Sequence, residues 1–181
     1  MVEQKNLVSA LSVTNYLLSL DKRREYFSKS RLLVVDKEEN YHSRPIIGNF
    51  RLNKVLQMVQ SLHYSCYGQP LFRDVIKAYE HGGVVPFIFK NFKTLYWENN
   101  NNSFSSLDEK QKEFISKVFY YLKENYNDWE LRELAHDDLA WENARKSKLE
   151  GKSDAFVYDS EVLEYYRVLS GSLLEAMNIK C

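Results

Sequence analysis

Hydrophobic residues recur at every third or fourth position along most of this sequence, which is the spacing of an amphipathic helix. The clearest stripe lies between residues 51 and 67 and consists of Leu52, Val55, Leu56, Val59, Leu62 or His63, and Cys66. Weaker stripes predict further helices over about residues 3–20, 87–97, 107–125, 129–136 and 141–148, and from residue 159 or 160 onward. We therefore expect a mainly α protein, a single compact domain of about six helices with residues 51–67 as its central helix.

One shorter segment has the pattern of a strand. Residues 31–36 form an apolar, β-branched run with polar ends, and a polar loop follows it. Because a strand needs a partner, we expect residues 41–47 to pair with this run. The pattern thus predicts a small β-hairpin near residues 31–47.

Glycine and proline mark the helix boundaries between residues 68 and 92. Gly68 follows the last apolar position of the central helix and can adopt the positive φ that ends it. Gly82-Gly83 indicates a turn with special φ and ψ, and Pro86 suits the first turn of the next helix. The turn lacks the glycine spacing of a phosphate-binding loop. Residues 75–79 are too short and too mixed to distinguish a strand from a helical turn.

Capping signals and composition organise the second half of the chain. Ser106 and Glu109 match a capping box, and Asp128 can cap the helix at 129–136. Residues 149–158 have the composition of a linker. This divides the chain into a helical domain over residues 1–148 and a C-terminal helix within residues 159–181, which either packs on the domain or binds a partner.

Charge and hydropathy narrow the range of partners. The 25 basic and 25 acidic residues leave no net charge, so no global field attracts nucleic acid or an anionic membrane. A nucleic-acid-binding protein would need a local basic patch, for which the candidates are Lys22, Arg23, Arg24, Lys29 and Arg31. No stretch approaches the roughly 20 apolar residues that span a bilayer, and the first residues lack a secretory pattern. We expect a cytoplasmic protein with no membrane partner.

The chain has two cysteines, and their positions do not predict a disulfide or a metal site. Cys66 lies inside the central helix and Cys181 is the last residue, so they form neither a disulfide framework nor a metal half-site. We expect them to be reduced.

No group of side chains has the pattern of a catalytic site, and we expect no catalytic residue, metal or cofactor. His63 lies on or beside the apolar stripe, where a hydrogen-bonded core histidine is the favoured interpretation. The run His136-Asp137-Asp138 points its side chains in different directions, which suits a helix end better than a metal site. An enzyme would require two of His63, His81 and His136 to converge with a carboxylate in one pocket.

Three segments together resemble the Panacea domain family, which includes SocA-like antitoxins and GepA-like phage-associated proteins. Residues 52–56, LNKVL, resemble the KLQKLLY-type helix of the family. Residues 68–72, GQPLF, and 78–86, AYEHGGVVP, resemble its G-x-PLF and AW-x-YGPVVP elements. Residues 131–145, LRELAHDDLAWENAR, resemble its LS-x-LTH-x-x-x-PW-x-x-AR stretch. The resemblance extends over about residues 5–148.

The sequence departs from the family pattern at several positions. Gly83 and Ala140 replace prolines, and Tyr79 replaces a tryptophan. Residues 21–50 are longer than the short connection of the family, which suggests an inserted hairpin or loop. These departures indicate a divergent member.

The resemblance implies a helical, non-enzymatic antitoxin-like protein that neutralises a cognate protein toxin by direct binding. Two alternatives are an adaptor that delivers its partner to a protease and an enzyme built on His63, His81 and His136. The residues carried over as a partner-binding framework are Tyr79, His81, Gly82, Gly83, Val85, Pro86, Trp129, His136 and Trp141. Core packing is the competing explanation for the same residues, because buried aromatic side chains are usually structural.

Overall fold

The computed structural model of the chain describes residues 7–29, 31–35, 41–45, 49–98 and 103–181. In chain order, the elements within these ranges are α1 (Ala10–Leu20), β1 (Arg31–Val35), β2 (Tyr41–Pro45), α2 (Asn49–Tyr67), β3 (Lys77–Tyr79), β4 (Gly82–Val84), α3 (Pro86–Lys93), the π-helical segment η1 (Thr94–Glu98), α4 (Glu109–Asn125), α5 (Asp128–His136), α6 (Leu139–Leu149), α7 (Ser160–Leu169) and α8 (Gly171–Ala176). The predicted mainly helical fold class with a small hairpin is confirmed.

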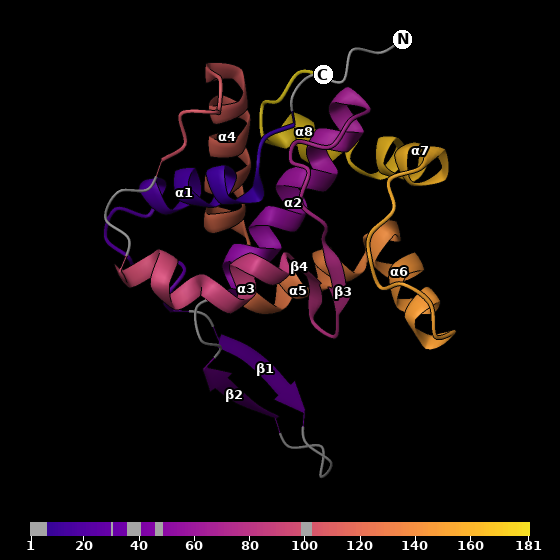
Figure 1. The fold of residues 1–181 in the computed structure, drawn as a ribbon, viewed down its shortest axis with the longest axis horizontal. Coiled ribbons are helices and arrows are strands. Elements are labelled where there is room, and N and C mark those ends of the chain that lie inside the picture. The colour runs from indigo at the N-terminus through magenta and orange to yellow at the C-terminus, as the bar shows by residue number, and fades with distance from the viewer. Residues whose placement is uncertain (1–6, 30, 36–40, 46–48, 99–102) are drawn as a thin grey trace.

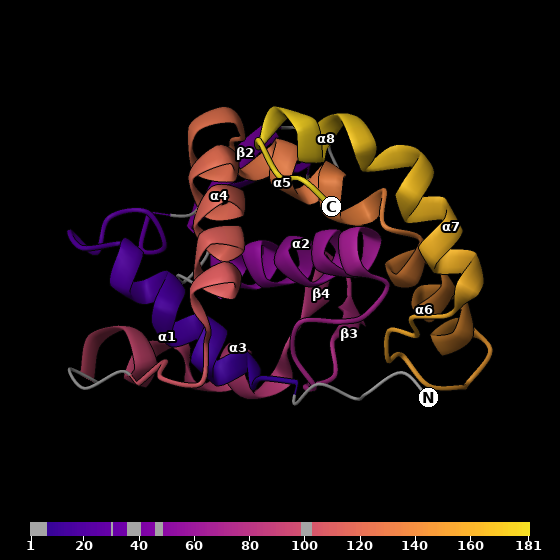
Figure 2. The same cartoon turned by 90° about the horizontal axis from the view of Figure 1, so that it is seen from above.

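Helix α2 is the centre of the molecule. Figures 1 and 2 show it passing between α1 and α4 on one side and α6 and α7 on the other. It contacts α1, α3, α4, α5, α7 and strand β4, and every residue from 52 to 65 is buried. A helix buried all round is usually apolar all round. This one is not, because Asn53, Lys54, Gln57, Gln60 and Ser61 are among its buried residues.

The end of α2 follows the glycine signal in the sequence. Gly68 has a φ of 68°, and its N–H donates to the Tyr64 carbonyl over 2.8 Å. The loop after it is held against the helix by Gln60, whose Oε1 accepts from the Leu71 and Phe72 N–H groups at 2.8 and 3.1 Å. The Gln60 amide also donates to the Phe72 carbonyl over 2.8 Å. One amide side chain therefore satisfies three backbone groups that have no strand partner.

Figure 1 shows two hairpins, of which β1–β2 lies below the helices and β3–β4 lies between α3 and α6. Strands β1 and β2 pair antiparallel, with Leu33 opposite Ser43. The turn of the predicted hairpin, residues 36–40, and its last residues, 46–47, lie outside the described residues. The segment left undecided, residues 75–79, contains β3, which pairs antiparallel with β4 and places Ala78 opposite Gly83.

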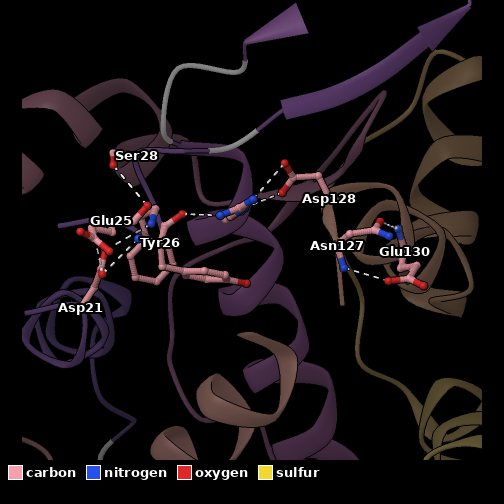
Figure 3. Close-up of polar contacts among 9 residues, drawn as sticks. Asp21, Glu25, Tyr26, Ser28, Asn127, Asp128 and Glu130 are labelled. Carbon is pink, nitrogen blue, oxygen red and sulfur yellow. Dashed lines mark hydrogen bonds and ion pairs between the residues drawn. The ribbon is translucent and has the colours of Figure 1, made fainter. Parts of the chain in front are cut away.

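Two predicted caps are wrong by one or two residues. The capping box of α4 is made by Asp108 and Gln111, with Gln111 N–H donating to Asp108 Oδ1 over 2.8 Å, and not by Ser106 and Glu109. The cap of α5 is Asn127, which forms a box with Glu130 (Figure 3). Several polar residues in succession fit the same pattern, and the turn geometry selects one of them. Asp128 is thereby available for an ion pair.

The two ends of the described chain also differ from the sequence predictions. Helix α1 begins at Ala10 with Ser9 as its cap, and Val8 forms a bridge to Phe72 instead of a helical turn; residues 3–6 of the expected helix lie outside the described residues. The last helix is divided into α7 and α8 at Ser170. The segment predicted as a linker hydrogen-bonds to β3, with the Ala78 N–H donating to the Asp154 carbonyl over 2.8 Å.

The expectation of reduced cysteines is wrong for this structure. Cys66 and Cys181 form a disulfide across 115 sequence positions, with 4.9 Å between their Cα atoms. Met177 and Ile179 are buried just before Cys181. Burial of these apolar side chains holds the final segment close to the end of α2, where Cys66 lies. Sequence spacing carried no sign of this pairing.

Candidate functional site

The polar side chains of α2 hold the β3–β4 hairpin as a neighbouring strand would. The Gly83 N–H donates to Gln57 Oε1 over 2.7 Å, and Lys54 Nζ donates to the Gly83 carbonyl over 2.8 Å. One residue beyond β4, the Val85 N–H donates to Asn53 Oδ1 over 2.9 Å. The hairpin and the residue after it are therefore fixed by three side chains from two successive turns of α2.

Both glycines of the hairpin are required by close approach. Gly82 has a φ of 110°, and a Cβ added there would lie 2.6 Å from Lys54 Nζ. A Cβ on Gly83 would lie 2.7 Å from Ile76 Cγ2 and 2.8 Å from Phe156 Cζ. The special backbone position inferred from the Gly-Gly pair is thus confirmed at Gly82, and Gly83 is explained by space.

Asp138 joins the same helix to α6 and α7. Its Oδ2 accepts from Gln57 Nε2 at 2.9 Å and from Ser61 Oγ at 2.8 Å. Its Oδ1 accepts from the Tyr166 hydroxyl and from the Ala140 N–H at the start of α6. A buried carboxylate with this many donors is well stabilised. Burial and the neighbouring Asp138 carboxylate raise the pKa of Tyr166, so Tyr166 stays a hydroxyl donor.

Lys54 is the one fully buried cation of this network among the described residues. Burial lowers its pKa to about 7, although the Asp138 carboxylate acts in the opposite direction. Its ammonium group also lies 5.4 Å from the centre of the Phe50 ring. The amine therefore serves chiefly as a donor to the hairpin.

On the outer side of the hairpin lies a connected row of aromatic rings, which we call the aromatic strip: Phe89, Tyr79, Trp141 and His136. The Phe89 and Tyr79 rings are 5.6 Å apart, and Trp141 Nε1–H donates to the Tyr79 carbonyl over 2.9 Å. His136 stacks on Trp141 with ring centres 4.1 Å apart and planes 10° apart. All four side chains are partly exposed. The strip is therefore a surface feature built on a buried polar base.

Cations border the strip. Lys148 Nζ lies 5.8 Å from the Tyr79 ring centre and the Arg145 guanidinium 6.0 Å from that of Trp141. The His136 ring donates from Nε2 to the Glu80 carbonyl over 3.1 Å. Burial, and secondarily Arg132, lower the pKa of His136 to about 4, so His136 is neutral at physiological pH.

The structure brings together most, but not all, of the site residues predicted from sequence. Tyr79, Gly82, Gly83, Val85, Pro86, His136 and Trp141 lie in or beside the β3–β4 hairpin, and His81 is exposed at its turn. Trp129 is separate, at the start of α5, 41% exposed, with the Arg132 guanidinium 5.2 Å from its ring centre. The role of these residues in partner binding stays a prediction.

The three histidines considered for catalysis do not share one pocket. His63 is a hydrogen-bonded core histidine, as predicted, with Nδ1–H donating to the Gln69 carbonyl over 2.8 Å. It lines a hollow of about 160 Å³ with Asp108, and neither His81 nor His136 belongs to that lining. In the described part of the chain, no group of three His, Cys, Asp or Glu side chains is placed to hold a metal ion. Within the same ranges, no helix has the length and apolar character needed to span a membrane.

Sequence reasoning missed the polar base of the site. Asn53, Lys54 and Gln57 lie opposite the apolar stripe of α2, a face that is normally exposed to water. One signal was available: this face carries amides where a solvated face usually carries acids paired with lysines. Amides can both donate and accept, which suits the docking of a bare backbone.

Comparison with known families places this site inside a recognised domain. Residues 52–142 match the family model described as "Antitoxin SocA-like, Panacea domain". That range begins at Leu52 in the first turn of α2 and ends one residue after Trp141, so it contains the hairpin, Asp138 and the whole aromatic strip. Comparisons with curated proteins and with solved structures gave no match.

Proposed function

We propose that this chain, which belongs to the SocA-like antitoxin family with the Panacea domain, neutralises a partner protein toxin by binding it directly. The membership rests on a match to half of the chain, from residue 52 to residue 142. Direct binding of a toxin goes beyond family membership, and the aromatic strip is the observation that supports it.

The strip has the composition of a protein-binding surface. Aromatic and arginine side chains are the residues most often found at the energetic centre of protein interfaces. Here two partly exposed rings, Phe89 and Tyr79, continue into Trp141 with Arg145 beside it. The buried hydrogen bonds beneath fix the backbone that carries these rings, so little conformational entropy is lost on binding.

The test is co-expression of this chain with each small open reading frame next to its gene. We expect one product to stop growth when expressed alone, and to be rescued by this chain and purified with it. Phe89→Ala and Trp129→Ala remove partly exposed rings, and we expect Phe89→Ala to lose at least about tenfold in affinity. Trp97→Ala, at a position 57% exposed in η1, is the matched control.

The alternatives give different results in the same system. If this chain delivers its partner to a protease, rescue disappears in cells lacking the ATP-dependent proteases while the complex still forms. If no neighbouring product is toxic or bound, neutralisation by direct binding is wrong. Rescue that persists without any complex would instead direct attention to an enzymatic activity.

A further inference from the structure

A second surface with distinct chemistry lies away from the aromatic strip. A hollow of about 660 Å³ is formed between the turn after α1, the first turn of α2 and the last turns of α4. Its cationic lining residues are Lys22, Arg23, Lys29, Arg51 and Lys123, and its acidic ones are Asp21 and Glu25. We call it the basic hollow.

The charge of Asp21 is directed into the protein. Its two carboxylate oxygens accept from the N–H groups of Glu25, Tyr26 and Phe27 at 3.1–3.2 Å (Figure 3), and Oδ2 also accepts from the Tyr96 hydroxyl at 3.0 Å. Asp21 is 3% exposed. It therefore shapes the turn that carries the basic side chains and does little to neutralise them.

Arg51 is likewise committed to the protein. It donates from Nε to Asp128 Oδ1 over 2.5 Å and from Nη1 to the Tyr26 carbonyl over 2.7 Å. Figure 3 shows Asp128 and Tyr26 on either side of these contacts. The ion pair holds Arg51 in one wall of the hollow, and the Asp128 carboxylate neutralises the charge of the Arg51 guanidinium.

Four exposed cations remain: Lys22, Arg23, Lys29 and Lys123. Within the described residues none of the four takes part in an ion pair, and Glu25 is the one exposed acid of the lining. In a chain with no net charge, this local excess is distinctive. Of the basic residues singled out in the sequence, Arg24 instead places its guanidinium over the Tyr96 ring, and the side chain of Arg31 lies outside the described residues.

We propose that the basic hollow binds an acidic segment of the partner protein, with carboxylates at the four cations and an apolar side chain against Tyr120. Tyr120 is 42% exposed on α4 and lines the hollow with Leu20. The proposal rests on the proposed function for the identity of the partner, whereas the chemistry of the hollow stands by itself. A nucleic acid fits less well, because it requires an extended basic track and several stacking rings, and Tyr120 is the one exposed ring in this lining.

The experiment needs no toxin. The probe is a fluorescein-labelled peptide of glutamates with one central phenylalanine, titrated with the full chain and followed by fluorescence anisotropy. The same peptide with glutamine in place of glutamate reports on charge, and single-stranded and duplex oligonucleotides report on nucleic acid. The test variant is Lys22→Glu/Lys29→Glu. Its control is Lys110→Glu/Lys180→Glu, which changes net charge equally at two exposed lysines outside the hollow.

We expect saturable binding of the glutamate peptide that weakens with added salt. Affinity should fall about tenfold or more in Lys22→Glu/Lys29→Glu and stay within about twofold in the control. Absence of binding, equal loss in both double variants, or tighter binding of an oligonucleotide at the same residues overturns the proposal. Circular dichroism and thermal melting confirm that both variants are folded. If the peptide does not bind but this chain rescues growth from a toxin, the proposed role of the basic hollow is wrong and the proposed function stands. If the peptide binds but no toxin is neutralised, only the proposed function is wrong.

Discussion

Gly83 shows how one missing side chain permits the central contact of the fold. Its backbone bonds to Gln57 and Lys54, and an added Cβ would lie 2.7–2.9 Å from Ile76, Phe156 and Gln57 atoms. We predict that Gly83→Ala lowers the free energy of unfolding by about 1–3 kcal/mol, the usual cost of overpacking. Urea denaturation followed by circular dichroism measures it.

Gly171 supplies the matched control for this prediction. It begins α8 without a positive φ, and a Cβ there would have no atom within 4 Å. Gly171→Ala should be neutral or stabilise by up to about 1 kcal/mol, because alanine restricts the unfolded chain. Equal destabilisation by the two substitutions would show that Gly83 is not closely packed.

Lys54 predicts a pH dependence of stability. Its pKa is about 7 in the folded protein and 10.5 as the reference value, so between these values the unfolded state binds more protons. Stability then rises with pH across this window, by at most about 1.4 kcal/mol per pH unit. Below about pH 7 both states carry the charge and the contribution is constant. Lys54→Met should abolish the rise.

The measurement compares unfolding free energies of the wild type and Lys54→Met from about pH 7 to pH 9.5. The range stops there because tyrosines with raised pKa values, such as Tyr166 and Tyr96, act in the opposite direction above their usual pKa. Lys110→Met, at an exposed position, should keep the wild-type slope. Parallel curves for the wild type and Lys54→Met would mean that Lys54 titrates normally.

At the scale of elements, the sequence predicted helices well and their polar faces poorly. Periodicity located α2 because Leu52, Val55 and Val59 fall on one face, but periodicity cannot tell what covers the opposite face. The answer depends on the β3–β4 hairpin, whose strands are three residues each. Such short strands have too few positions to show a period of two. The hairpin forms because α2 supplies its missing hydrogen bonds.

The buried hydroxyl of Tyr166 contributes to the attachment of α7. Tyr166 donates to Asp138, whereas its neighbour Tyr165 donates to the Asp137 carbonyl at the surface over 3.0 Å. Tyr166→Phe should therefore destabilise by about 1–3 kcal/mol, because a buried carboxylate oxygen loses a donor. Hydrogen exchange of α7 amides should quicken in the same variant.

Tyr165→Phe is the comparison for Tyr166→Phe, since it removes the same atom from an exposed hydrogen bond. Its effect should remain below about 1 kcal/mol, because water replaces the lost partner. If the two variants were equally stable, and α7 exchanged at the same rate in both, Asp138 would not hold α7.

At the scale of the whole molecule, the sequence identified the residues of the candidate site more successfully than it identified the contacts between them. The family resemblance named Tyr79, His136 and Trp141, and the structure joins them in one strip. Phe89 was not named from the sequence, because helical spacing alone does not show that its ring lies against Tyr79 of another element. Trp129 was grouped with the strip on family spacing and lies apart from it. Spacing along a chain does not determine which helix ends meet.

The last prediction concerns the Cys66–Cys181 disulfide, which covalently joins two residues that are 115 positions apart in the sequence. A loop of 115 positions restricts the unfolded state strongly, and its removal typically costs about 2–4 kcal/mol. We expect Cys66→Ser/Cys181→Ser to unfold at lower urea, yet to keep its fold, because Met177 and Ile179 stay buried and Lys117 still donates to the Asn178 carbonyl over 2.9 Å.

Reductant separates the covalent contribution from the substitution itself. Adding a phosphine reductant should lower the unfolding midpoint of the wild type to that of the double variant, and should leave the double variant unchanged. A wild-type midpoint that ignores reductant would mean that the two thiols are not joined in solution. In that case the cysteines would be reduced, as expected from the sequence, and the final segment would be held by its buried apolar residues and the hydrogen bond from Lys117 to the Asn178 carbonyl.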